Sequence, residues 1–354
     1  MTNNSETIAI VGGHFAPGYT CALAALDAGK RVLFFGRKHA FSDKKDVSLE
    51  YRMLSENQHI KWHNIESGRG LKNSVDMVLG VIQSLIAFGK TRPSYVLSFG
   101  SYLSIPVCTA AWLLHIPVVI HEQTIIPGTA NRILARFAKK IFITFPETEK
   151  FFPQKKVVHT GIPIYHEEQK PDAPLWLSTS KKPLLLVLGG SSGSHSVNIR
   201  IEEIIDKLSP QFRVVHQTGD NIYHDFGRLR ARESHDYTVR EFITPSELDY
   251  LMDHVGILVT RSGANTFFLV LQKLTPCVLI PLPWSAHGEQ KALAEILSKA
   301  GVGYIYNQEQ QNTLYSIIVK AYEQRLRLIH KYDTLNTYKK LMVSGRTIIE
   351  QAGI

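Results

Sequence analysis

The residues best suited to chemistry stand where apolar runs end in glycine. The segment IAIVGGH places His14 directly after a glycine pair, and LLLVLGGSSG places Ser191 directly after Gly190. A strand that passes through glycines into a helix presents backbone N–H groups and the positive end of the helix dipole, which together bind anions such as phosphate. Ordinary capped turns between strands and helices have a similar composition. Two such turns far apart in the chain indicate two sites, or two halves of one site.

Two further segments carry polar side chains at the ends of predicted strands. In TRSGANT, residues 260–266, Ser262 is expected to cap a helix. In IHEQ, a strand ends in His121, Glu122 and Gln123. Three long polar side chains in a row exceed what a helix cap requires, which favours a functional role.

His14 is the preferred general base, because an imidazole with a pKa near neutrality can take the proton of a hydroxyl group. The alternative is a turn histidine that hydrogen-bonds its own loop.

Several familiar signatures are missing from the sequence. Neither glycine turn reads G-x-G-x-x-G or continues into Gly-Lys-Ser/Thr, so a dinucleotide site is disfavoured and a P-loop is excluded. There is no His-Glu-x-x-His motif and no Asp-x-Asp pair to hold a metal ion against a diphosphate. We therefore predict no metal and no cofactor. Any phosphate chemistry is expected to rely on backbone amides, helix dipoles and side-chain donors.

Composition and strand pattern predict an α/β fold of two doubly wound domains. The chain has 354 residues, of which 44% are hydrophobic and 20% charged, enough for two cores. Short apolar runs alternate with helical stretches, which is typical of parallel sheets with crossover helices. The segment 161–182 holds three prolines and is the predicted linker. Cys21, Cys108 and Cys277 show no metal-binding or redox spacing and are expected to be buried free thiols.

The positive charge is concentrated in the first half of the chain. Residues 1–163 contain 19 Lys and Arg against 11 Asp and Glu, a net charge of +8, whereas residues 164–354 contain 21 against 20, a net charge of +1. This asymmetry favours one face that docks on an anionic surface over general nucleic-acid binding. Residues 68–90 have apolar side chains at helical spacing, which predicts either a surface helix resting on lipid or a core helix. No signal peptide or membrane-spanning segment is expected.

One long segment resembles the MurG family of N-acetylglucosaminyltransferases. It reads HEQ-x-x-x-PG-x-x-N-x-x-LA-x-x-AK from His121 and is followed by FPET. Six further motifs occur in the family's order over nearly the whole chain: GGH-x-x-P, GGS-x-G-x-x-x-x-N, HQTG, EFI, SGA-x-T and IPLP…Q. The resemblance implies two Rossmann-like domains of the GT-B type. The first domain would hold the acceptor. It would comprise residues 1–163, a last helix at about 335–351 that crosses back to it, and the end of the chain to 354. Residues 164–334 would hold the nucleotide sugar.

The resemblance also implies roles for single residues. His14 would be the base, and Glu122 would orient the base or the acceptor. The donor-binding residues would be Gly190, Ser191, Phe242, Ile243, Ser262, Ala264, Thr266 and Gln290. The acceptor-binding residues would be Gly12, Gly13, Gln123, Thr124 and Asn131.

The chain departs from the family pattern at four places. The first glycine turn is shorter, and Thr124 stands where the family has an asparagine. Tyr165 ends a GIPIY segment in which the family has an arginine. Leu269 stands where the family has the glutamate that pairs with the ribose hydroxyls.

The function implied is the inverting, metal-independent transfer of N-acetylglucosamine from UDP-GlcNAc to lipid I, an undecaprenyl diphosphate linked to muramoyl-pentapeptide, to form lipid II of peptidoglycan. The expected location is peripheral, on the cytoplasmic face of the bacterial inner membrane. Two alternatives stay open at this point. One is a catalytically impaired, membrane-associated scaffold, and the other is an enzyme of the same fold with different chemistry, such as a UDP-sugar 2-epimerase.

Overall fold

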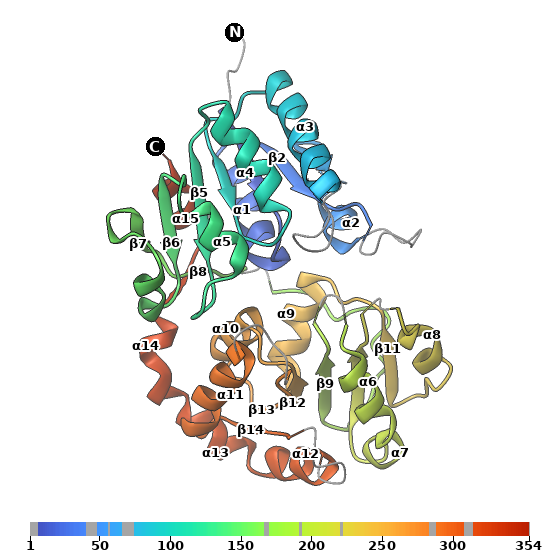
Figure 1. Cartoon of the computed structure of the whole chain (residues 1–354). Coiled ribbons are helices and arrows are strands. Elements are labelled where there is room, and N and C mark those ends of the chain that lie inside the picture. Colours follow the sequence, from blue (N-terminus) through green and yellow to red (C-terminus); the bar gives the residue numbers. More distant parts are fainter. Residues whose placement is uncertain are drawn as a thin grey trace. The chain divides into compact units, whose positions relative to one another are not determined.

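The computed structural model describes residues 6–39, 48–55, 57–65, 74–165, 170–190, 193–219, 222–282, 288–307 and 314–353. The chain divides into two compact units (Figure 1). Unit 1 comprises Met1–Tyr165 and Lys340–Ile354, and unit 2 comprises His166–Lys339. Each unit is built on its own parallel sheet with helices on both faces, which is the doubly wound α/β architecture that the alternating pattern predicts.

The sheet of unit 1 has the strand order β3-β2-β1-β4-β5-β6-β7, with every neighbouring pair parallel. The strands are β1 (Thr7–Val11), β2 (Arg31–Gly36), β3 (Ile60–Asn64), β4 (Val96–Ser98), β5 (Val118–Glu122), β6 (Lys140–Ile143) and β7 (Val157–His159). The connecting elements are α1 (Phe15–Asp27), α2 (Leu49–Ser55), α3 (Ser74–Lys90), α4 (Ser104–Leu113), α5 (Thr129–Leu134) and the 3₁₀ helices η1 (Pro146–Phe151) and η2 (Gln154–Lys156). The order reverses between β1 and β4, and ligands of such folds bind at the carboxyl edge beside this reversal.

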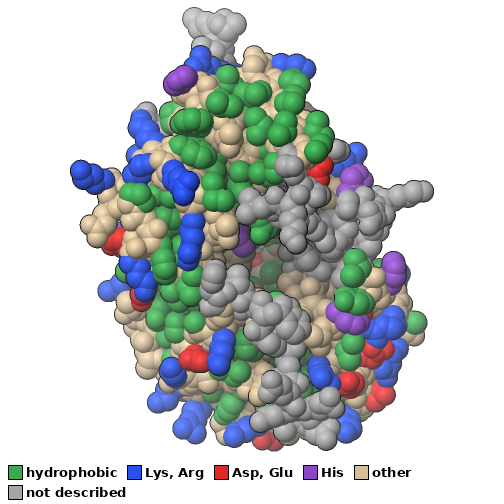
Figure 2. All heavy atoms as spheres, in the orientation of Figure 1, with side chains coloured by type: hydrophobic (Ala, Val, Ile, Leu, Met, Phe, Trp, Pro, Cys, Tyr) green, Lys and Arg blue, Asp and Glu red, His purple; other side chains and the backbone are tan. Residues whose placement is uncertain are grey.

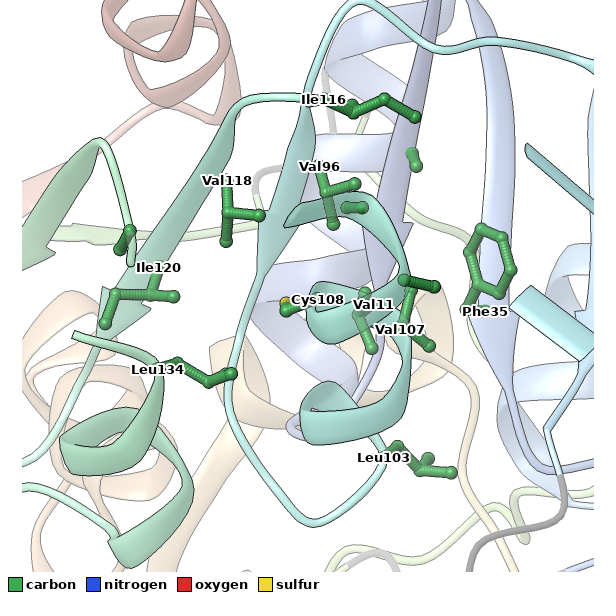
Figure 3. Close-up of a cluster of buried hydrophobic side chains, with 14 of the residues drawn as sticks. Val11, Phe35, Val96, Leu103, Val107, Cys108, Ile116, Val118, Ile120 and Leu134 are labelled. Atoms are coloured by element: carbon green, nitrogen blue, oxygen red, sulfur yellow. The ribbon is translucent and has the colours of Figure 1, made fainter. Parts of the chain in front are cut away.

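Alternate residues of the central strands enter two different cores. Ala9 and Val11 of β1 belong to a core covered by α3 and α4 (Figure 3), whereas Ile8 and Ile10 belong to a core covered by α1 and the end of the chain. All five residues of β1 are buried. Burial on both faces explains why these strands are continuous apolar runs without polar alternation.

Unit 2 repeats the plan with the order β11-β10-β9-β12-β13-β14. Its strands are β9 (Leu184–Leu188), β10 (Arg213–Gln217), β11 (Tyr237–Arg240), β12 (Val255–Thr260), β13 (Cys277–Leu279) and β14 (Gly303–Ile305). Its helices are α6 (His195–Glu202), α7 (Ile205–Leu208), α8 (Asp225–Arg230), α9 (Pro245–His254), α10 (Ala264–Lys273), α11 (Glu289–Lys299), α12 (Leu314–Glu323), α13 (Arg325–His330), η4 (Lys331–Leu335) and α14 (Asn336–Lys339). Here the order reverses between β9 and β12.

The end of the chain differs from the single helix expected over residues 335–351. After α14 the chain forms β15 (Met342–Val343), which pairs with β8 (Ile162–Pro163), and then α15 (Gly345–Ala352), which packs on α1. Ser344 caps α15 by accepting a hydrogen bond from the Thr347 N–H at 3.2 Å. A methyl group on Gly345 would lie 2.6 Å from the Thr20 carbonyl oxygen, so only glycine allows this close packing.

Candidate functional site

Three turns of unit 1 are packed together at the carboxyl edge of its sheet. A Cβ built on Gly13 would lie 2.2 Å from the carbonyl oxygen of Gly100, in the turn after β4. A Cβ on Gly100, whose φ is +82°, would lie 3.3 Å from the amide nitrogen of Asn131 on α5. The glycines therefore allow the turns after β1 and β4 and the start of α5 to touch. His14, the N-cap residue of α1, is the next residue in the chain after Gly13 of this assembly.

His14 itself is exposed, and its side chain makes no capping hydrogen bond. Desolvation by the surrounding protein lowers the pKa of His14 to about 4. The imidazole is therefore neutral at neutral pH and has a lone pair with which to accept a proton. The alternative role, a turn histidine bonded to its own loop, finds no capping contact.

Both carboxylate oxygens of Glu122 accept hydrogen bonds from the loop and helix that follow it. One carboxylate oxygen accepts hydrogen bonds from the Thr124 N–H at 3.0 Å and from the Thr124 hydroxyl at 2.6 Å. The other accepts from the Gly128 N–H at 3.1 Å and from the Asn131 amide at 3.0 Å. Burial raises the pKa of Glu122, and these hydrogen bonds oppose the rise. Glu122 thus shapes the segment 123–128 and the start of α5, with Thr124 supplying two of its four donors.

His121 is fully buried beside this network. Its Nε2 donates to the Gly161 carbonyl oxygen at 2.8 Å, which leaves Nδ1 as an acceptor. Burial lowers the pKa of His121 to about 4, and the hydrogen bond to Gly161 opposes this shift. Within the part of unit 1 that the structure describes, His121 Nδ1, Gln123 Oε1 and Asn131 Oδ1 have no hydrogen-bond partner. Tyr165 lies at the same edge, with its ring centroid 5.7 Å from that of Tyr19.

In unit 2, Gln217 connects two of the expected donor-site segments. Its amide nitrogen donates to the Gly190 carbonyl oxygen at 3.0 Å, and its amide oxygen accepts from the Ile243 N–H at 3.2 Å. The Gly189 N–H donates to the Gln217 carbonyl oxygen at 3.3 Å. Ile243 is buried and Phe242 is half-buried. Ser191, expected in this turn, lies outside the described residues.

Arg261 is the main residue of this edge to which the sequence assigned no role. Its side chain is buried, and it contacts the Ser194 hydroxyl at 2.5 Å and the Gln290 amide oxygen at 3.3 Å. Burial lowers the pKa of Arg261 to about 10, so the guanidinium is charged at neutral pH. No carboxylate among the described residues pairs with it. A buried cation with only neutral partners is stabilised by an anionic ligand.

The remaining donor-site predictions fall around Arg261. Ser262 was expected to cap α10, which is wrong: Gly263 is the N-cap residue, and the Ser262 hydroxyl donates to the Gln290 carbonyl oxygen at 2.7 Å. Ala264 begins α10 and is buried, whereas Thr266 and Leu269 on the same helix are half-buried. Because glycine already has the extended backbone of an N-cap, the serine is free to tie the two segments together.

Asn198, which follows the glycine turn in the sequence motif, holds the neighbouring turn in place. Its amide donates to the Thr218 carbonyl oxygen at 3.0 Å and to buried Asp225 at 2.8 Å, while its oxygen contacts His216 at 3.0 Å. A Cβ on Gly193 would lie 2.0 Å from the Thr218 carbonyl oxygen, so the turns after β9 and β10 are in contact. Burial lowers the pKa of His216 to about 3, so the imidazole in this network is neutral at neutral pH.

Two doubly wound domains, each with glycine turns at the carboxyl edge of its sheet, define the class of GT-B glycosyltransferases. The chain belongs to glycosyltransferase family 28: residues 11–143 match the N-terminal domain of that family, and residues 184–343 match its C-terminal domain.

A relative from Lachnospira eligens is 32% identical over 348 residues, covering 93% of this chain and 94% of its own. It is named UDP-N-acetylglucosamine--N-acetylmuramyl-(pentapeptide) pyrophosphoryl-undecaprenol N-acetylglucosamine transferase. The crystal structure of Acinetobacter baumannii MurG has a TM-score of 0.61 at 21% identity and covers 98% of this chain and 99% of that one. A UDP-GlcNAc 2-epimerase from Neisseria meningitidis also reaches 0.61, at 13% identity, with 98% and 99% covered. Both structural matches show the fold alone.

Proposed function

We propose that the protein transfers N-acetylglucosamine from UDP-GlcNAc to the lipid-linked muramoyl-pentapeptide acceptor, the reaction for which its relatives are named. The observation that carries the proposal is the buried, charged Arg261 at the glycine turns of unit 2. It supplies the positive charge that a nucleoside diphosphate requires. A neutral imidazole, His14, stands beside the glycine turns of unit 1 and supplies the base.

The reaction assigns a separate task to each edge. In unit 2, Arg261 and the N-termini of α6 and α10 hold the diphosphate and stabilise the charge of the departing UDP. In unit 1, His14 takes the proton of the acceptor hydroxyl as its oxygen bonds to C1 of the sugar. The bond from C1 to the diphosphate oxygen breaks, and UDP leaves with the electron pair. Gln123, Thr124 and Asn131, with Gly12 and Gly13, would line the acceptor side.

The experiment that tests the proposal uses purified protein, radiolabelled UDP-GlcNAc and lipid I. We expect labelled lipid product. Formation of an epimerised UDP-sugar without labelled lipid would indicate the epimerase alternative. UDP binding without any turnover would indicate a scaffold.

The proposed membrane face is the exposed side of α3. Five apolar side chains at helical spacing are exposed there: Val75 is 69%, Val78 59%, Leu79 44%, Ile82 47% and Ile86 56% exposed. Leu85 on the same helix packs into the core instead. Figure 2 shows hydrophobic side chains gathered over α3 and α4, where Trp112 is also exposed.

Three residues expected at the start of α3 lie outside the described residues: Arg69, Leu71 and Lys72. None of the helices in the described ranges is long and apolar enough to cross a bilayer.

The protein is expected to sediment with vesicles that contain anionic lipid, and less so as salt is added, because exposed Lys90 ends α3 and exposed Arg92 lies two residues beyond it. Replacing Ile82 with glutamate should weaken binding by about tenfold or more through loss of one buried apolar side chain. Leu326→Glu, at an exposed apolar position of unit 2, is the matched control and should bind normally. Equal binding to neutral vesicles would contradict the prediction.

The Leu269 position tests the identity of the donor. A carboxylate there would reach ribose hydroxyls in the family, and a hydrogen bond to a charged group contributes about 1.5–3 kcal/mol. If the donor is a uridine diphosphate sugar, Leu269→Glu should tighten UDP binding by about tenfold or more in calorimetry. Leu269→Gln should give a smaller gain, because it is uncharged. If neither the wild type nor the glutamate variant binds UDP, the donor is not a uridine nucleotide.

A further inference from the structure

Trp176 lies in the predicted linker, and its indole contacts both ends of one turn of unit 2. Its Nε1 donates a hydrogen bond to Glu247 Oε1 at 2.6 Å, and the guanidinium carbon of Arg240 lies 4.7 Å from the centroid of its ring. Arg240 is the last residue of β11, and Glu247 lies in the first turn of α9. One side chain therefore holds together the two ends of the turn 241–246.

Both contacts of Trp176 involve charged groups, which makes them stronger than contacts between neutral side chains. Glu247 Oε1 accepts from Trp176, while Glu247 Oε2 accepts from the Thr244 N–H at 2.8 Å and from the Thr244 hydroxyl at 2.9 Å. Arg240 Nε is buried and has no hydrogen-bond partner among the described residues, so the face of the indole offsets part of its desolvation. Trp176 thus supports the cap of α9 and covers the guanidinium at the end of β11.

The linker around Trp176 is itself fastened to unit 2. The Ser178 carbonyl oxygen accepts a hydrogen bond from Arg213 Nη1 at 2.7 Å, and Lys182 forms an ion pair with Asp236 at 2.7 Å. Asp236 directly precedes β11, the edge strand of the sheet. The indole is therefore presented by a segment that is anchored beside this strand.

The turn 241–246 is joined to the glycine turn of the same unit. Gln217 donates to the Gly190 carbonyl oxygen at 3.0 Å and accepts from the Ile243 N–H at 3.2 Å. A nucleotide whose diphosphate lies at the glycine turn would place its nucleoside across Gln217, beside Phe242. The Phe242 ring is half-buried, so part of it is accessible for a base to stack on.

We propose that Trp176 is a positioning residue for the nucleoside end of the donor: by clamping Arg240 to Glu247, it fixes the turn that carries Phe242 and Ile243 and so sets the affinity for the base. It has no part in the chemical step. The inference rests on the proposed function, in which UDP-GlcNAc is the donor, and adds to it the residue that holds the nucleoside-binding turn.

The test measures affinities for UDP, uridine and inorganic pyrophosphate by calorimetry, with competition against UDP for the weak ligands. Trp176→Ala removes both contacts and should weaken UDP and uridine by about tenfold while leaving pyrophosphate unchanged. Trp176→Phe keeps a ring beside Arg240 but loses the N–H donor, so it should lose only about threefold. Leu175→Ala, at the fully exposed neighbouring residue, is the matched control and should bind as the wild type does.

Kinetics and a double-mutant cycle distinguish positioning from a general loss of stability. Trp176→Ala should raise KM for UDP-GlcNAc and change kcat little, because contacts to the base are the same in the ground state and the transition state. Glu247→Gln should also weaken uridine binding, since only one of its two polar atoms can accept a hydrogen bond. The double variant Trp176→Phe/Glu247→Gln should lose less binding free energy than the two single variants together, because both changes remove the same hydrogen bond.

The outcomes separate this inference from the proposed function. Unchanged uridine affinity in Trp176→Ala overturns the role of Trp176, and so do equal losses for uridine and pyrophosphate together with a lower Tm. In either case the transferase function stands if the wild type transfers sugar to lipid I. A wild type that binds UDP and uridine with the expected dependence on Trp176, but transfers no sugar, overturns the transferase function alone. A wild type that binds neither UDP nor uridine overturns both.

Discussion

Replacing His14 with alanine is expected to lower turnover by about a hundredfold or more, the usual effect of losing a general base. Under the proposed function, the neutral imidazole beside Gly13 takes the proton of the acceptor hydroxyl. UDP affinity should change little, because the donor edge is built by the other unit. Steady-state kinetics with lipid acceptor and calorimetry with UDP measure the two effects separately.

His59→Ala is the control for this experiment, because His59 is an exposed histidine in the turn before β3 of the same unit. It should retain wild-type turnover. Near-normal turnover of the His14 variant would exclude His14 as the base. No residue would then be assigned to take the proton of the acceptor hydroxyl. A parallel loss of UDP affinity would instead indicate that His14 contributes to the donor site.

Replacing Arg261 with alanine is expected to lower kcat/KM for UDP-GlcNAc by about a hundredfold or more, since hydrogen bonds to a charged group contribute about 1.5–3 kcal/mol each and the guanidinium can make two. Arg261→Lys keeps the charge but loses the fork geometry and should recover only part of the rate. UDP affinity should fall with kcat/KM, whereas affinity for uridine, which has no phosphate, should be unaffected.

Arg327→Ala, at an exposed arginine on α13, is the matched control in unit 2. Because Arg261 also ties Ser194 to Gln290, the Tm of each variant must be compared with that of the wild type. Equal losses of UDP and uridine affinity, together with a lower Tm, would assign Arg261 a structural role and remove the main support for a diphosphate site.

Much of the fold follows from local patterns in the sequence. The runs IAIV and LLLVL are apolar at every position because β1 and β9 are buried on both faces, and the glycines after them mark the turns at the carboxyl edge. The end of the chain was harder to predict. The family resemblance implied one helix over about 335–351, but Met342 and Val343 pair with Ile162 and Pro163, 180 residues earlier, and a new helix begins at Gly345.

The sequence alone determined the fold class, the two glycine turns, His14 as the candidate base and the resemblance to one family, because all of these depend on short segments and their order. The tertiary structure decided which charges serve the sites. Glu122 appears beside His121 in the sequence, yet donors folded back from residues 124–131 occupy it. Arg261 reaches the Ser194 hydroxyl from 67 positions away. Such partners are set by the packing of distant elements, which no local pattern records.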